Sequence, residues 1–232
     1  MRLDKFLSEK NVGTRSVLKE YIKKGRVTVN GTVAKAADMK IDENNDSITF
    51  DGIELFYEKF VYYMLNKPAG VVSATNDNTC TTMMDLLDVE NKDTLFSIGR
   101  LDKDTEGLLL ITNDGDLCHR LLSPKKHVPK TYFVRVENPL SKEDIIVLEK
   151  GVDIGEERET LPAKIEILNE LEFYLTITEG KFHQVKRMMQ AVDNEVIYLQ
   201  RISMGGLKLD ENLPLGEYRK LTGSEIDLLN KR

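Results

Sequence analysis

The sequence is poor in the residues that build disulfide frameworks and zinc sites. Its 232 residues include three histidines and two cysteines, Cys80 and Cys118. The cysteines form no CxxC spacing and the histidines do not cluster, so we expect neither a structural metal nor a disulfide. Two free thiols are typical of a reducing compartment, and we predict a cytoplasmic location.

Long hydrophobic runs are also absent. No apolar stretch reaches the roughly 18 residues that a membrane-spanning helix needs. The first ten residues, MRLDKFLSEK, carry charge where a secretory signal would be apolar. We therefore expect no membrane partner. Hydrophobic residues make up 41% and charged residues 31% of the chain, which predicts a folded globular protein.

The chain has no overall surplus of positive charge, since its formal net charge is −6. Binding to nucleic acid depends, however, on where the charge lies rather than on the average. Residues 1–40 contain ten Lys or Arg and four Asp or Glu, a net charge of +6. A basic head of this kind favours a polyanionic partner.

The basic head is predicted to form two short helices followed by two hairpins. The stripe of Leu3, Phe6 and Leu7 indicates the first helix, and Thr14 is a suitable N-cap for the second. The second helix has an apolar face formed by Val17, Leu18, Tyr21 and Ile22. Its other face carries Arg15, Lys19 and Lys23, with Arg26 just beyond the helix end. Asn30-Gly31 and Asp51-Gly52 predict the two hairpin turns.

Residues 1–56 resemble the S4-like RNA-binding domain, an α-L module first recognised in a small-subunit ribosomal protein. The resemblance lies in the order of helix, basic helix, Gly25-Arg26-Val27 and Val29-Asn30-Gly31. It implies that the basic side chains Arg15, Lys19, Lys23 and Arg26 contact RNA phosphates. A solvated helix face is the alternative reading of the same spacing. We place a linker at residues 57–60 and a second domain at residues 61–232.

The second domain is predicted to be α+β, because it mixes hairpins with long connections. Strands are expected at Val61–Leu65, Gly107–Thr112, Thr131–Val136, Ala163–Ile167, Phe173–Thr178 and Val196–Ile202. Helices are expected at Asp116–Leu122, at Lys142–Lys150 behind the N-cap Ser141, at His183–Val192 and from Ser224.

Five segments of the chain carry a family resemblance. SIGRLDKDTEGLLLITNDG, residues 97–115, places Asp102 and Asp104 in a polar loop before an apolar strand. The other segments are LNKPAGVVSAT (65–75), PKTYFVRV (129–136), EGKFHQVKRM (179–188) and GGLKLDENLPLGEYRKL (205–221). In their order along the chain these segments resemble the pseudouridine synthases, most closely the RsuA family. The resemblance implies a mixed, mostly antiparallel sheet crossed by an active cleft, with Asp102 on its floor.

The implied activity is isomerisation of a uridine in ribosomal RNA. The reaction breaks the bond between ribose C1′ and uracil N1 and joins C1′ to C5, so we expect no metal, nucleotide or other cofactor. A carboxylate beside C1′ is needed, followed by removal of the C5 proton. Asp102 matches the catalytic aspartate of the family. It either attacks C1′ or removes a proton from the ribose.

The resemblance also implies the partners of Asp102. Lys186 matches a position where most of the wider superfamily has arginine, and it would keep Asp102 ionised and oriented. A lysine is a point charge and cannot hold a carboxylate by two parallel bonds. Arg187 is the alternative partner, but it lies about 100° around the helix from Lys186, so both are not expected to face one carboxylate. We otherwise assign Arg187 to RNA binding.

Two further residues are assigned by their place in the motifs. Tyr132 matches the tyrosine that stacks on the target uracil, and its hydroxyl could pass on the C5 proton. Arg100 matches a residue that fills the space left by the flipped uridine. We expect His183 to be structural or to contact RNA rather than to catalyse.

Other functions and substrates stay open at this point. The chain could be a non-catalytic RNA-binding protein, or a nucleoside glycosidase that uses Asp104 as a second carboxylate. The segment HQVKRM, and a sequence that stops soon after the last motif, resemble the small-subunit enzymes. The expected partner is therefore 16S ribosomal RNA or a small-subunit assembly intermediate, with large-subunit RNA as the alternative. We expect the enzyme to be a monomer.

Overall fold

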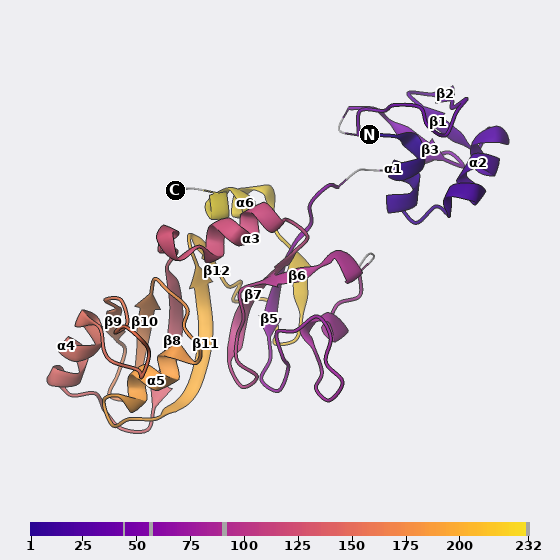
Figure 1. Ribbon diagram of the computed structural model, residues 1–232. Coiled ribbons are helices and arrows are strands. Elements are labelled where there is room, and N and C mark those ends of the chain that lie inside the picture. Colours follow the sequence, from indigo (N-terminus) through magenta and orange to yellow (C-terminus); the bar gives the residue numbers. More distant parts are fainter. Residues whose placement is uncertain (44, 56–57, 90–91, 231–232) are drawn as a thin grey trace. The chain divides into compact units, whose positions relative to one another are not determined.

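The chain folds into two compact units, Met1–Lys59 and Phe60–Arg232 (Figure 1). The computed structural model describes residues 1–43, 45–55, 58–89 and 92–230. The linker expected at residues 57–60 begins at residue 57, which lies outside the described residues. Within these ranges, the helices are all too short or too polar to cross a bilayer.

The N-terminal unit packs two helices against a small antiparallel sheet. The helices are α1 (Leu3–Glu9) and α2 (Arg15–Lys23), and the strands are β1 (Val27–Val29), β2 (Thr32–Val33), β3 (Ile48–Phe50) and β4 (Ile53–Leu55). The strand order is β2-β1-β3-β4. Both predicted hairpins are confirmed, and Asn30 and Gly31 adopt the positive φ angles of a tight turn.

The core of the N-terminal unit is small and its apolar pattern is the predicted one, with one exception. Leu3, Phe6 and Leu7 of α1 are buried together with Leu18 and Ile22 of α2. Val17 was expected on the inward face of α2 but is 37% exposed. It precedes Leu18 by one position and therefore lies about 100° around the helix from the buried stripe.

The C-terminal unit is built on one mixed sheet. Its strands are β5 (Tyr62–Lys67), β6 (Phe96–Ile98), β7 (Glu106–Thr112), β8 (Lys130–Val136), β9 (Lys164–Ile167), β10 (Glu172–Ile177), β11 (Val196–Met204), β12 (Leu207–Lys208) and β13 (Tyr218–Lys220). The order is β13-β5-β7-β11-β8-β10-β9, with β6 beside β7 and β12 beside β11. Strands β7 and β11 run parallel and the other pairs are antiparallel, so the predicted mixed, mostly antiparallel sheet is confirmed.

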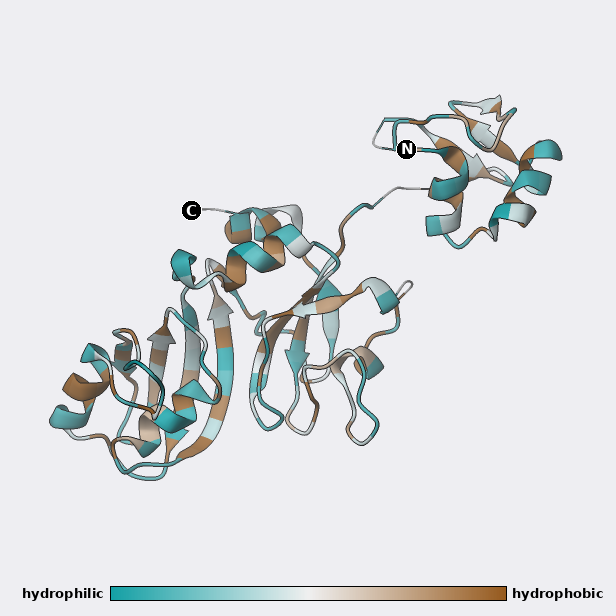
Figure 2. Ribbon diagram, in the orientation of Figure 1, coloured by the Kyte–Doolittle hydropathy of each residue, from teal (hydrophilic) through white to brown (hydrophobic). Residues whose placement is uncertain are grey.

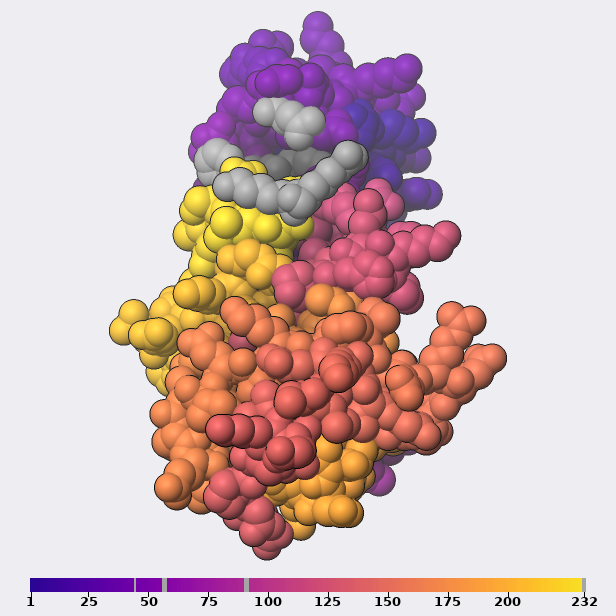
Figure 3. Space-filling view, turned by 90° about the vertical axis from the view of Figure 1, so that its left-hand side faces the viewer, coloured from indigo at the N-terminus to yellow at the C-terminus, as the bar shows by residue number. Residues whose placement is uncertain are grey.

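Helices and single turns of 3₁₀ helix cover the sheet. The α-helices are α3 (Gly115–Leu122), α4 (Lys142–Lys150), α5 (Gln184–Gln190) and α6 (Gly223–Asn230), and the 3₁₀ turns are Met83–Leu86, Lys92–Thr94 and Pro124–Lys126. Helix α4 begins after Ser141 as predicted, because Ser141 and Asp144 form a reciprocal capping box. Helix α5 begins at Gln184 rather than His183, since His183 has a left-handed backbone conformation. Figure 3 looks onto the end of this unit that carries α4 and β9.

Strand β7 is buried on both faces, which explains its unbroken apolar sequence. Leu109 and Ile111 point into a cluster with Met188 of α5, whereas Leu108 and Leu110 point into a second cluster under α3 and α6. Alternate residues of a strand face opposite sides, so a central strand covered twice has no polar face. The hydropathy colours of Figure 2 show this strand as apolar.

We predict that Gly107→Ala destabilises the C-terminal unit by more than about 2 kcal/mol. Gly107 has φ +98°, and a Cβ atom there would lie 2.3 Å from the backbone oxygen of Arg201 on the parallel strand β11. Denaturant unfolding of the variant tests this. Gly115→Ala is the matched control, because Gly115 opens α3 with no atom within 4 Å of an added Cβ. A loss of stability for Gly107→Ala no larger than for Gly115→Ala would contradict the expectation.

Candidate active site

The loop between β6 and β7 holds Asp102 between two anchored neighbours. Leu101 is 6% exposed, and its backbone N–H and C=O both bond to the hydroxyl of Ser73, at 3.0 and 2.9 Å. On the other side, Thr105 is buried and its N–H donates to the carbonyl of Asp102 at 3.1 Å. The Asp102 side chain is 25% exposed between these anchors. The loop therefore presents a carboxylate to solvent from a fixed backbone.

Lys67, at the end of β5, supports the same loop from beneath. Its side chain is completely buried, and its ammonium group donates to the carbonyls of Pro68, Lys103 and Thr105 at 2.9, 3.3 and 2.8 Å. Burial lowers the pKa of Lys67 to about 8, although the carboxylates of Asp104, Glu106 and Asp102 act in the opposite direction. A lysine charge thus holds backbone carbonyls on both sides of Asp104.

Lys186 of α5 stands between two carboxylates of the loop. Its Nζ lies 3.6 Å from Asp102 Oδ2 and 2.5 Å from Asp104 Oδ1, so the hydrogen bond goes to Asp104. Partial burial would raise the pKa of Asp104, but the hydrogen bond and charge of Lys186 outweigh it and lower that pKa. Asp104 is 72% exposed on its side chain, far more than Asp102. Lys186 is therefore shared by Asp102 and Asp104, and its closer contact is with Asp104, the more exposed of the two carboxylates.

His183 lies three positions before Lys186 and Arg187 directly follows it, and their side chains point in different directions. His183 Nε2 lies 3.5 Å from Asp102 Oδ1, a contact that the sequence did not predict. Arg187 turns away from Asp102: its Nη1 bonds to Glu156 Oε1 at 2.6 Å, and its Nη2 bonds to the carbonyl of Ile154. The structure thus brings Lys186, and not Arg187, to the candidate catalytic aspartate. Since Glu156 pairs with Arg187, an RNA contact by Arg187 would compete with that ion pair.

Tyr132 lies in β8 and is more deeply buried than its expected role suggests. It is 8% exposed and belongs to the same apolar cluster as Leu101, the residue before Asp102. A uracil that stacks on Tyr132 would therefore contact the small part of the ring that reaches the surface. Arg100, in contrast, is exposed at the start of the loop, two residues before Asp102.

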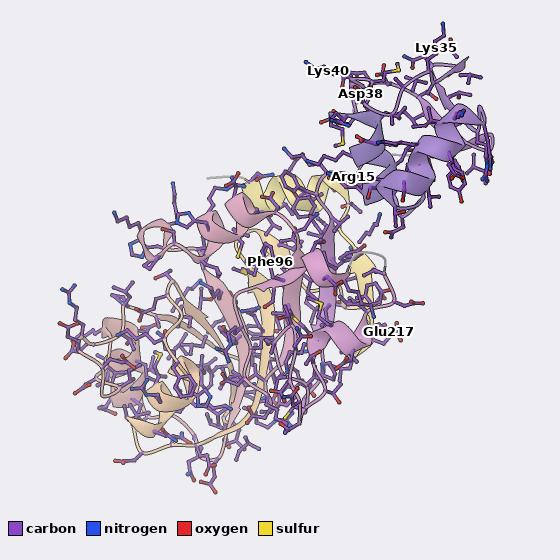
Figure 4. The ribbon with its side chains drawn as sticks, turned by 45° about the vertical axis from the view of Figure 1, so that its right-hand side comes forward. Arg15, Lys35, Asp38, Lys40, Phe96 and Glu217 are labelled. Atoms are coloured by element: carbon purple, nitrogen blue, oxygen red, sulfur yellow. The ribbon has the colours of Figure 1, made fainter. Side chains whose placement is uncertain are left out.

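The predicted phosphate-binding residues of the N-terminal unit fall into two groups. Arg15, Lys19 and Lys23 are exposed on α2, and Figure 4 shows Arg15 on a different side of the unit from Lys35 and Lys40. Arg26 instead forms a two-pronged ion pair with Asp51, and its guanidinium lies 4.2 Å from the centre of the Tyr21 ring. Its charge is partly neutralised within the hairpin, which the spacing of basic residues did not reveal.

No metal site accompanies these residues: the described ranges contain no group of three or more His, Cys, Asp or Glu side chains placed to hold an ion. A cavity of the C-terminal unit is lined by residues of α3, α6 and the 3₁₀ turn Pro124–Lys126, and none of its lining comes from the Asp102 loop. What the loop, Lys186 and His183 offer is an oriented carboxylate next to a cation and an imidazole. This set can act as nucleophile or base without a cofactor.

Comparison with known proteins assigns this arrangement to a family. The family described as RNA pseudouridylate synthase matches residues 61–191, and the S4 domain family matches residues 1–47. The chain belongs to the RNA pseudouridylate synthases. Asp102, Tyr132 and Lys186 all fall within the matched synthase region.

The relatives extend over the whole chain. An uncharacterized RNA pseudouridine synthase of Bacillus subtilis is 51% identical, covering 100% of this chain and 99% of that protein. Ribosomal small subunit pseudouridine synthase A is 42% identical in Haemophilus influenzae, covering 100% of both chains, and 41% identical in Escherichia coli K12, covering 97% and 98%. A crystal structure of a pseudouridylate synthase aligns with a TM-score of 0.71 at 42% identity, covering 99% of each chain. The resemblance to this family is confirmed.

For this pseudouridine synthase, we predict that Lys67→Met removes a pH dependence of stability. Because burial lowers the pKa of Lys67 from 10.5 to about 8, the unfolded chain binds more protons between these values, and stability rises with pH. The wild type should gain about 3 kcal/mol relative to the variant between about pH 7 and pH 10.5. Urea unfolding at each pH measures this difference, and it must be taken between the two proteins because the pKa of Lys130 is also lowered to about 8.

The same substitution should slow turnover by roughly tenfold or more, because the carbonyls beside Asp102 lose their donor. Lys103→Met is the control in the same loop, since the Lys103 side chain is exposed and bonds to Cys80 Sγ at 3.3 Å. If the free energy of unfolding varied with pH in the same way for the wild type and for Lys67→Met, Lys67 would not be held as a buried charge.

Proposed function

We propose that this enzyme converts one uridine of small-subunit ribosomal RNA to pseudouridine and that Asp102 is its catalytic carboxylate. The observation that carries the proposal is a single one: the family's motif aspartate lies on an anchored loop, 3.6 Å from the ammonium group of Lys186. The choice of small-subunit RNA rests on the relatives named ribosomal small subunit pseudouridine synthase A, which match along their full length.

The reaction conserves every atom of the uridine. The N1–C1′ bond breaks, the uracil turns, C5 bonds to C1′, and the C5 proton is removed while N1 regains one. In one route Asp102 attacks C1′ and forms a covalent ester; in the other it removes a ribose proton. Both need an ionised carboxylate with a free oxygen, and the 3.5 and 3.6 Å contacts to His183 and Lys186 are long enough to leave the oxygens accessible.

Tyr132 and Arg100 complete the proposed uridine site. The target base must leave its stack to reach Asp102, and Arg100 on the exposed start of the loop would occupy the space that it leaves. Tyr132 would stack on the flipped uracil through the small part of its ring that reaches the surface, and it could pass on the C5 proton through its hydroxyl. The chemistry needs no metal or cofactor in either route.

The N-terminal unit would hold the RNA, because Arg15, Lys19 and Lys23 form an exposed basic row on α2. The proposed partner is ribosomal RNA or a small-subunit assembly intermediate, which places the enzyme in the cytoplasm, where ribosomes are assembled. We propose that it acts as a monomer.

Asp102→Asn should reduce pseudouridine formation to background, because the amide can neither attack C1′ nor accept a proton. Affinity for RNA should change little. Asp104→Asn, two positions away, should keep activity within about tenfold of wild type, since Lys186 can then pair with Asp102 alone. The assay is pseudouridine mapping and mass analysis of small-subunit RNA incubated with each protein. Full activity of Asp102→Asn would overturn the mechanism, and release of free uracil would indicate a glycosidase.

The basic row predicts a salt dependence of RNA binding. Replacing Arg15, Lys19 and Lys23 together by Gln should reduce the steepness of the log–log salt plot by about 2–3, because each phosphate contact contributes about 0.7–0.9. A matched control replaces Lys5, Lys24 and Lys35 by Gln, which removes the same charge from outside the row. Equal slopes for the two triple variants would show that the effect depends on net charge alone.

A further inference from the structure

Phe182 exposes its ring although its backbone is firmly held. The residue is 70% exposed. Its carbonyl accepts a hydrogen bond from Arg187 Nη1 at 3.1 Å, and the preceding Lys181 is fixed by its N–H to Gln184 Oε1 at 2.9 Å and by its ammonium group to the carbonyl of Arg158 at 2.6 Å. The ring therefore projects from a rigid turn rather than from a loose loop.

The Phe182 ring is the outer member of a stack that leads to the catalytic carboxylate. It lies on the imidazole of His183, with ring centres 3.8 Å apart and planes 19° from parallel. His183 in turn places Nε2 3.5 Å from Asp102 Oδ1. His183 adopts φ +49°, an uncommon conformation for a residue other than glycine. The turn thus accepts an unfavourable backbone conformation where the two rings stack beside Asp102.

The exposed ring is poorly explained as part of the fold. Most of its surface is in water, so it contributes little to the apolar core, whereas a partner that covers the ring would remove that apolar surface from water. Positive charge lies close to the turn, because Arg187 bonds to the Phe182 carbonyl and Lys186 stands 3.6 Å from Asp102. Unpaired bases stack on aromatic side chains irrespective of their identity.

We propose that the free face of Phe182 stacks on an unpaired base of the substrate RNA close to the target uridine. The stack of base, Phe182 and His183 then ends beside Asp102 and adds to the affinity for the bound strand. This inference rests on the proposed function, since it takes RNA as the substrate. It makes Phe182 a binding residue for the flanking nucleotide, separate from the uracil site at Tyr132.

The test compares Phe182→Ala, Phe182→Leu and Phe182→Tyr on unmodified small-subunit ribosomal RNA transcribed in vitro. Loss of a base stack of about 1–3 kcal/mol corresponds to a rise of about 5- to 150-fold in Kd and KM. We expect this rise for Ala and Leu, which lack a ring, and near wild-type values for Tyr, with kcat little changed throughout. Ile197→Ala is the matched control, because Ile197 is 57% exposed in the same unit and should have no effect.

The Kd for the RNA is measured separately from turnover, so that failure of this inference is distinguishable from failure of the proposed function. Absence of pseudouridine with the wild type would refute the function, while the affinities still decide the role of Phe182. Equal Kd values for the wild type and Phe182→Ala would overturn the stacking. A fall in kcat at unchanged KM would also overturn it, because the ring would then act through His183 on Asp102.

A photoreactive phenylalanine analogue at position 182 tests where the base lies. Crosslinking should occur to a nucleotide within two or three positions of the modified uridine, mapped by stops in reverse transcription. A crosslink confined to distant nucleotides would contradict the placement beside the target.

Discussion

The geometry of the proposed active site depends on one lysine charge that is buried against the Asp102 loop. An ammonium group without partners is very unfavourable in a protein interior, so the three carbonyls around Lys67 must stay in place while it is charged. Two of them belong to Lys103 and Thr105, which lie close to Asp102 in the loop. The cost of this burial is visible in the lowered pKa of Lys67, about 8. In return, the hydrogen bonds from Lys67 fix the position of the Asp102 loop.

The sheet fixes the same loop from its other end. Lys67 on β5 lies opposite Gly107 on β7, and Gly107 in turn lies opposite Arg201 on β11. The close approach of Arg201 leaves no room for a side chain at Gly107. Glu106, next to it, accepts a hydrogen bond from the hydroxyl of Tyr198 at 2.6 Å. The start of β7 is therefore held by both of its neighbours at the point where the Asp102 loop enters the strand.

The sequence predicted the features that local pattern controls and missed those that depend on distant contacts. The unbroken apolar run of β7 and the N-cap Ser141 of α4 predicted the bounds of these two elements to within one residue. Strand β13 was missed, because Tyr218–Lys220 is short, polar and defined by pairing with β5, more than 150 positions earlier. In the site, motif order predicted that Lys186 faces Asp102. The buried state of Lys67, the pairing of Arg26 with Asp51 and the closeness of Asp104 to Lys186 depend on the folded loops, and no spacing in the sequence encodes them.

The sharing of Lys186 between two carboxylates bears on its proposed role as the partner of Asp102, where the family resemblance implies arginine in most of the wider superfamily. A guanidinium that grips a carboxylate by two parallel bonds occupies both of its oxygens. The ammonium group of Lys186 makes its hydrogen bond to Asp104 and stands 3.6 Å from Asp102, close enough to attract the charge but not to bond to it. Asp104 is well solvated and tolerates this contact at little cost. In the proposed mechanism, Lys186 would thus orient Asp102 electrostatically and leave an oxygen of that carboxylate free to approach the ribose.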